Sequence, residues 1–84
     1  MRNELLSLAN VGKAVARDLD LLGIKTISQL KNKDPKVMYD ELSRIKDVKQ
    51  DPCMLDTFCA IVHEAKTGEK KPWWYWSRIR KGEL

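Results

Sequence analysis

Residues 8–24 read LANVGKAVARDLDLLGI, and this stretch decides the fold. It opens on a turn signal at residues 10–12, Asn-Val-Gly, and continues with apolar residues spaced three and four apart up to Gly23. Such spacing gathers side chains on one face of an α-helix, and glycine tolerates the left-handed backbone that commonly ends a helix. The stretch therefore predicts a tight turn and then a helix that begins just after Gly12 and ends at Gly23. The apolar face of this helix consists of Val11, Val15, Leu19 and Leu22.

Helical signals also surround this stretch, and no strand-like alternation of any length appears in the chain. A short helix over about residues 4–8 precedes the turn. Residues 26–29, Thr-Ile-Ser-Gln, have the capping-box pattern, in which the Thr26 side chain and the Gln29 side chain each accept from the other residue's backbone N–H. This pattern predicts a short helix through Leu30.

Two Asp-Pro pairs mark the next helices, because proline suits the first helical position and leaves the aspartate to cap it. Asp34-Pro35 predicts a helix over about 35–45, and Asp51-Pro52 predicts one over about 52–66 that ends at Thr67-Gly68. Their apolar faces carry Met38, Leu42 and Ile45 in the first and Leu55, Phe58, Cys59, Val62 and Ala65 in the second. The fold class is therefore all-α, a compact bundle of about five short helices.

The composition is that of one small folded domain over residues 1–84, with 43% hydrophobic and 33% charged residues. No run approaches the roughly 18 apolar residues that span a bilayer, and the N-terminal residues lack the apolar core of a signal peptide, so we expect a cytoplasmic protein without membrane contact. Net charge is +2 over residues 1–34, −1 over 35–67 and +3 over 68–84. Two basic ends suit a polyanionic partner, although many proteins with this pattern bind none.

The predicted turn has the geometry of an anion site. The first N–H groups of a helix lack intrahelical partners, and the helix dipole is positive there. Lys13 and Arg17 are four residues apart and point away from the apolar face of the helix. The alternative interpretation is a packing unit with a solvated basic face. The candidate nucleic-acid-binding residues are Asn10, Val11, Gly12, Lys13 and Arg17.

The glycine and apolar pattern of the first 30 residues resembles the helix-hairpin-helix family. It comprises Leu8, Val11, Gly12, Ala16, Leu19, Gly23, Ile24 and Leu30. The resemblance implies a tight turn between two helices, with a glycine that lets the backbone approach a ligand. The family's turn usually has a glycine where this chain has Asn10. Asparagine is the next most tolerant residue for left-handed backbone, so the turn can still form.

A closer likeness extends over nearly the whole chain, through residues 8–17, 22–24 and 51–56 to the Trp-rich end. These blocks resemble the pathogenicity-locus family, also called mitomycin-resistance-like, and Asp-Pro-Cys-Met-Leu-Asp at 51–56 is the most distinctive of them. The first half is also similar to the C-terminal domain of TfoX-type competence regulators. The likeness implies a bacterial, all-α helix-hairpin-helix protein that binds DNA, with a fold like that of SAM domains.

The tail over residues 69–84 concentrates all three tryptophans between basic residues. Trp73, Trp74 and Trp76 could stack on unpaired bases, but a small bundle gains more by docking large aromatic rings on its core. We expect the tail to dock on the bundle, with Trp73 and Trp76 facing inward if it is helical.

Metal and catalytic sites find little support. Cys53 and Cys59 lie about 240° apart on one helix, which excludes a disulfide between them, and we expect two reduced, buried thiols. Cys59 and His63 share a helix face with Asp56 one turn earlier, but paired zinc motifs are missing, so we expect no metal. The chain also lacks a phosphate-binding Gly-rich loop and room for a catalytic pocket.

The sequence thus predicts a non-enzymatic module, without cofactor or small-molecule substrate, that binds DNA through the phosphate backbone and without sequence specificity. The alternative is a protein-interaction or oligomerisation module of the SAM-like class with no nucleic-acid partner.

Overall fold

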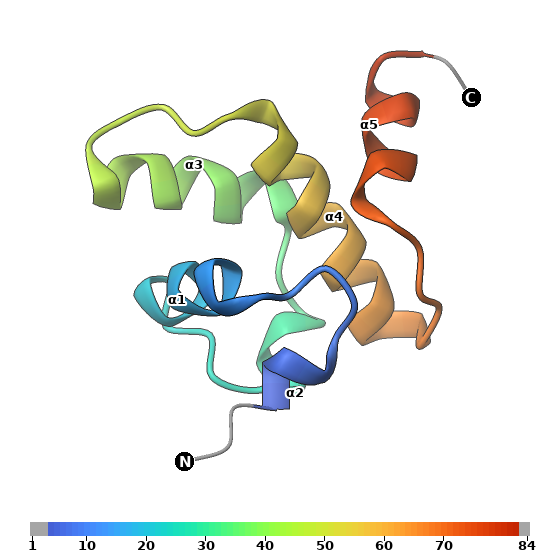
Figure 1. The fold of residues 1–84 in the computed structure, drawn as a ribbon. Coiled ribbons are helices and arrows are strands. Elements are labelled where there is room, and N and C mark those ends of the chain that lie inside the picture. Colours follow the sequence, from blue (N-terminus) through green and yellow to red (C-terminus); the bar gives the residue numbers. More distant parts are fainter. Residues whose placement is uncertain (1–3, 83–84) are drawn as a thin grey trace.

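The computed structural model describes residues 4–82. Its elements are a 3₁₀-helix η1 (Glu4–Ser7) and five α-helices: α1 (Lys13–Leu21), α2 (Ile27–Leu30), α3 (Pro35–Lys46), α4 (Pro52–Thr67) and α5 (Trp73–Arg80). The described residues contain no strand, so the predicted all-α fold class is confirmed. Helix α4 runs between α3 and α5, and α1 lies on the same side of it as α3 (Figure 1).

Local capping signals place most helix starts where the sequence predicts them. The capping box of Thr26 and Gln29 is formed in both directions at α2. Asp34 accepts from the Lys36 N–H at 2.8 Å, and Asp51 accepts from the Cys53 N–H at 2.9 Å. Each of these contacts joins residues close together in sequence, so it depends on little else in the fold.

Helix ends follow the glycine signals as well. Gly23 has φ 78° and Gly68 has φ 79°, both in the left-handed region that terminates a helix. The end of α3 carries no such signal, and there Asp47 adopts φ 54°. The expected first helix is only a 3₁₀ turn, because the Leu8 N–H bonds to Leu5 O three residues back and the chain then turns at Asn10.

The core lies between α4 and the helices around it, and its largest fully buried apolar side chains are Phe58, Leu5, Leu19, Ile24, Leu30, Leu42 and Ile61. One expected core residue is wrong, because Ile45 is 45% exposed. Tyr39 lies about 100° around α3 from Met38 and is buried, with its hydroxyl donating to Gln50 O. Ile45 lies only about 20° around the helix from the buried Met38, so its face of α3 is the expected one. Its exposure follows instead from its position in the last turn of α3, which ends at Lys46.

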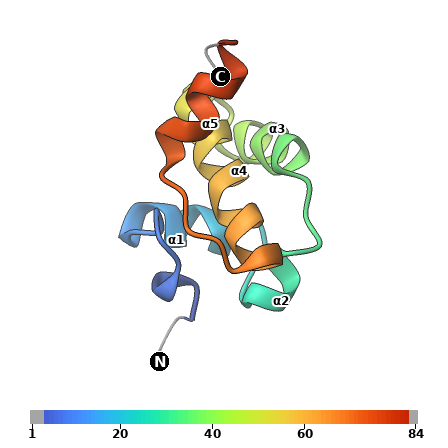
Figure 2. The same cartoon turned by 90° about the vertical axis from the view of Figure 1, so that its right-hand side faces the viewer.

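A buried polar contact joins α5 to α4. Asp56 is 1% exposed, accepts from the Ser77 hydroxyl, and lies 3.0 Å from Arg80 Nε through Oδ1. Helix α5 therefore stands alongside α4 in the turned view (Figure 2). Trp76 is half-buried with its ring 5.1 Å from that of His63, but Trp73 stays exposed, so the expectation of two inward-facing rings is wrong for Trp73. Trp73 is the first residue of α5, and its contact with the turn is made by its backbone N–H, which bonds to Asn10 Oδ1.

The two cysteines carry free thiols. Cys59 is half-buried, whereas Cys53 is exposed, so the expectation of a buried thiol is wrong at Cys53. That residue stands in the first turn of α4, which carries the exposed Asp51 and Pro52 beside it. No helix within residues 4–82 has the length and apolar character needed to cross a membrane.

Candidate nucleic-acid interface

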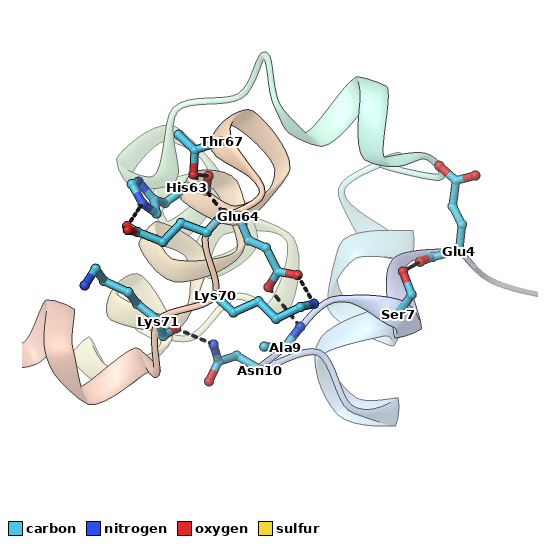
Figure 3. Close-up of polar contacts among 10 residues, drawn as sticks. Glu4, Ser7, Ala9, Asn10, His63, Glu64, Thr67, Lys70 and Lys71 are labelled. Atoms are coloured by element: carbon cyan, nitrogen blue, oxygen red, sulfur yellow. Dashed lines mark hydrogen bonds and ion pairs between the residues drawn. The ribbon is translucent and has the colours of Figure 1, made fainter.

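The turn at residues 9–12 is fixed to the opposite end of the chain. Asn10 has φ 69°, which confirms that asparagine takes up the left-handed backbone at this position. The Ala9 N–H donates to Glu64 Oε1 at 2.9 Å, and Lys70 Nζ lies 2.8 Å from the other oxygen of that carboxylate (Figure 3). Glu64 is buried, so these two contacts stabilise its carboxylate in the way that water would at the surface. The backbone of the turn is therefore anchored to α4.

The Asn10 side chain makes two further contacts, both with the segment before α5. Its Nδ2 donates to Lys71 O at 2.9 Å, as Figure 3 shows, and its Oδ1 accepts from the Trp73 N–H at 3.2 Å. Trp73 begins α5, and its N–H would otherwise lack a helical partner. Asn10 therefore caps a helix that lies 63 residues away in sequence.

Val11 and Gly12 differ in what they offer a ligand. Val11 is buried in the core, and its N–H bonds to Leu8 O at 3.3 Å. Gly12 is exposed with extended backbone, φ −100° and ψ −170°, and a Cβ built on it would meet nothing within 4 Å. Neither the backbone nor the packing requires glycine at position 12. Because Gly12 has no side chain, the backbone beside the start of α1 stays exposed.

The start of α1 carries no side-chain cap. Gly12 is its N-cap residue, and the first helical bond runs from the Ala16 N–H to Gly12 O at 2.9 Å. The N–H groups of Lys13, Ala14 and Val15 have no partner within residues 4–82, as the first turn of a helix requires unless a side chain caps it. Lys13 and Ala14 are exposed. This helix start is open to solvent.

The positive side chains beside this start are not neutralised within the described part of the chain. Lys13 and Arg17 are both exposed, and neither makes an ion pair there. The two carboxylates of α1 are already engaged, because Asp18 lies 2.7 Å from Lys46 Nζ and Asp20 pairs with Lys25. The structure therefore gathers Gly12, Lys13 and Arg17 at one exposed position and uses Asn10 and Val11 to hold the turn.

The basic segment before α5 is the part of this site that sequence reasoning missed. Lys70 and Lys71 lie beside the turn, although they are about 60 residues from it in sequence (Figure 3). Lys71 Nζ stands 4.6 Å from the centre of the Tyr75 ring, a cation–π contact, while Lys70 is paired with Glu64. No local pattern predicts contacts of this range.

The residues weighed as metal ligands serve other contacts. Asp56 holds Ser77 and Arg80, and His63 Nε2 lies 2.7 Å from Glu69 Oε1. Within residues 4–82 no group of three or more candidate ligands comes together. Burial raises the pKa of the Cys59 thiol, and the hydrogen bond to Asp51 raises that of Cys53, so neither thiol is activated as a nucleophile.

Comparison with known proteins places this architecture in a family. The family described as pathogenicity locus matches residues 2–82. The mitomycin resistance protein McrB of Streptomyces lavendulae is 38% identical over 79 residues, which cover 94% of this chain and 75% of that protein. No solved structure matches the chain.

Proposed function

The chain belongs to the pathogenicity-locus family, and we propose that it is a non-enzymatic DNA-binding module that contacts the phosphate backbone without sequence specificity. The observation that carries this proposal is the open start of α1, whose exposed N–H groups lie beside two unpaired cations, Lys13 and Arg17. We further propose that the turn and α1 act as a helix-hairpin-helix element. We also propose the cytoplasmic location that the sequence predicts.

A phosphate group fits this position for physical reasons. The unpartnered N–H groups of Lys13 and Ala14 point out of the helix start, where the dipole favours negative charge. Lys13 and Arg17 add mobile positive charge within one helical turn of it. Gly12 leaves room for an oxygen to approach the backbone, and Asn10 and Val11 hold the turn in shape. No base-reading side chain is involved, so the contact carries no sequence preference.

The predicted affinity is modest and depends on salt. Each phosphate neutralised by a cation contributes about −0.9 to the slope of log affinity against log salt concentration. Lys13 and Arg17 together give a slope of about −1.8 on this basis. Useful affinity therefore needs further contacts, from another surface of the chain or from a second copy.

Fluorescence anisotropy with a labelled DNA duplex tests the proposal. We expect binding at about 50 mM salt that weakens at about 200 mM, and a loss of about tenfold or more in the double variant Lys13→Glu/Arg17→Glu. Lys49→Glu and Lys31→Glu are matched controls, since both lysines are exposed and neither makes an ion pair within residues 4–82. Binding that ignores the double variant, or equals that of the controls, would overturn the proposal.

A protein-interaction or oligomerisation role is the second candidate, and exposed apolar residues on one side of the bundle favour it. Val37 and Ile45 on α3 and Val48 in the loop after it are all exposed. Analytical ultracentrifugation over a range of concentrations tests this role. Self-association that Val37→Lys abolishes, together with no DNA binding at low salt, would favour it over the DNA-binding proposal.

A further inference from the structure

Two of the three tryptophans are exposed, although burial of these rings would stabilise a chain of this size. Trp73 is 38% exposed and Trp74 is 49% exposed, while Trp76 is half-buried against His63. Neighbouring exposed indoles are informative because they are the side chains with most to gain from burial. The polar contacts that bind α5 to α4 come from Ser77 and Arg80, and the ring contact comes from Trp76. Trp73 and Trp74 are therefore free for contact with a ligand.

The surface around these rings is positive. Residues 70–82, which contain α5, include no aspartate or glutamate. Trp74, Arg78 and Lys81 are spaced four and three apart, so they share one exposed face of α5 and its end, where the Trp74 indole is followed by two cations. The carboxylates of α4 nearest to α5 are Glu64 and Asp56, and both are buried and paired with Lys70 and Arg80.

Trp73, the first of the exposed tryptophans, is bonded to the turn that precedes the proposed phosphate site. The Trp73 N–H bonds to Asn10 Oδ1 at 3.2 Å, and Asn10 is two residues before Gly12, the N-cap of α1. Two residues of chain span at most about 7 Å. The backbone at the start of α5 therefore lies close to the start of α1, and a strand whose phosphate sits at α1 has a short path to Trp73 and Trp74.

We propose that Trp73 and Trp74 are a stacking platform for unpaired bases, so that the preferred ligand is a nucleic acid with a single-stranded segment beside the phosphate held at α1. This inference rests on the proposed function and names its substrate class. Indole faces flanked by cations are how proteins bind single strands without sequence preference, since every base has a face to stack. A paired base has both faces covered by its neighbours, so a continuous duplex gains nothing from the platform.

Intrinsic tryptophan fluorescence and anisotropy together test the platform on the full chain. An oligothymidine of about 12 nucleotides should quench the fluorescence, and a duplex with a single-stranded overhang should bind about fivefold or more tightly than the same duplex with blunt ends. In Trp73→Leu/Trp74→Leu both the quenching and the overhang preference should be lost, with blunt-duplex affinity unchanged. The matched variant Trp73→Phe/Trp74→Phe keeps two rings and should retain most of the preference.

The outcomes separate this inference from the proposed function. Equal affinity of the wild-type chain for blunt and overhang duplexes overturns the platform, and sensitivity to Lys13→Glu would then leave the proposed function standing. Quenching by oligothymidine that survives Lys13→Glu/Arg17→Glu, with no duplex binding at about 50 mM salt, supports the platform and overturns the phosphate site at α1. A Leu variant that changes the oligomeric state and not the overhang preference shows that the rings contact protein instead.

Discussion

The start of α1 and the starts of α3 and α4 solve the same problem in different ways. Each helix begins with N–H groups that have no helical partner. At α3 and α4 the side chains of Asp34 and Asp51 accept from those groups, whereas at α1 the N-cap is Gly12 and no side chain does so. The difference separates the helix starts that a side chain caps from the one that is uncapped, which is the start that we propose binds phosphate.

The largest effect should come from closing the open start with a carboxylate. Gly12→Asp gives α1 the same cap as α3, and its Cβ meets nothing within 4 Å. A surface carboxylate in contact with phosphate costs roughly 2 kcal/mol, so DNA affinity should fall about 30-fold. Stability should rise by a few tenths of a kcal/mol through the new cap. Anisotropy and urea unfolding on the same sample measure both.

Gly12→Ser is the control for that variant, since serine caps the helix without adding charge. It should give the same small gain in stability with a much smaller loss of affinity. If Gly12→Asp stabilises the chain and leaves DNA affinity unchanged, the open start of α1 is not a phosphate site.

The next effect in size concerns the helix start that is capped from a distance. Asn10→Gly keeps the left-handed backbone of the turn but removes the bonds to Lys71 O and the Trp73 N–H. Two lost hydrogen bonds should destabilise the chain by about 1–2 kcal/mol. Urea unfolding measures the loss, and amide exchange should rise first at the start of α5. Unchanged exchange there would contradict the capping role of Asn10.

A smaller effect should follow from removing the side-chain cap of a helix that has one. Asp34→Ala removes the cap of α3 and should lower the free energy of unfolding by about 1 kcal/mol. DNA affinity should not change, because that helix start is not proposed to bind. Thermal unfolding and anisotropy check the two halves of this prediction. An equal loss of affinity in Asp34→Ala and in Gly12→Asp would remove the distinction between the helix starts.

The smallest effect should appear as a dependence on pH. The Cys53 N–H holds the pKa of Asp51 below its ordinary value of about 3.9, since the bond favours the charged carboxylate. The cap therefore contributes fully above that ordinary value, and its contribution is lost as pH falls through the lowered pKa. Unfolding curves of the wild-type chain and Asp51→Asn should converge at low pH. Curves that stay parallel would show that Asp51 contributes nothing through its charge.

Sequence reasoning succeeds here where the cause is local. The capping box at Thr26, the two Asp-Pro starts and the glycine ends involve residues within four positions of each other, and all are confirmed. Membership of the pathogenicity-locus family, expected from the blocks at 8–17, 22–24 and 51–56 and from the Trp-rich end, is confirmed too. The proposed use of the turn stays a prediction.

Sequence reasoning fails where the cause is distant. Ile45 fits the period of α3, but the period cannot say that the last turn of the helix lies beyond the core. The same holds for Trp73. Its spacing from Trp76 predicts that the two rings share a helix face, but it does not predict that the Trp73 ring is exposed. The contacts of Asn10 with residues 71 and 73 depend on the assembled fold, and so no pattern around position 10 contains them.

The distant contacts of Asn10 also bear on the order in which the chain folds. Contacts between residues far apart in sequence form slowly, because the entropy of closing the intervening loop is lost before they contribute. The caps of α2, α3 and α4 can form within single segments, whereas the turn at residues 9–12 gains its partners only when α4 and the segment before α5 have arrived. A partly folded chain would then hold helices like those of the native state around an unfinished turn, and substitutions at Asn10 should speed unfolding more than they slow folding.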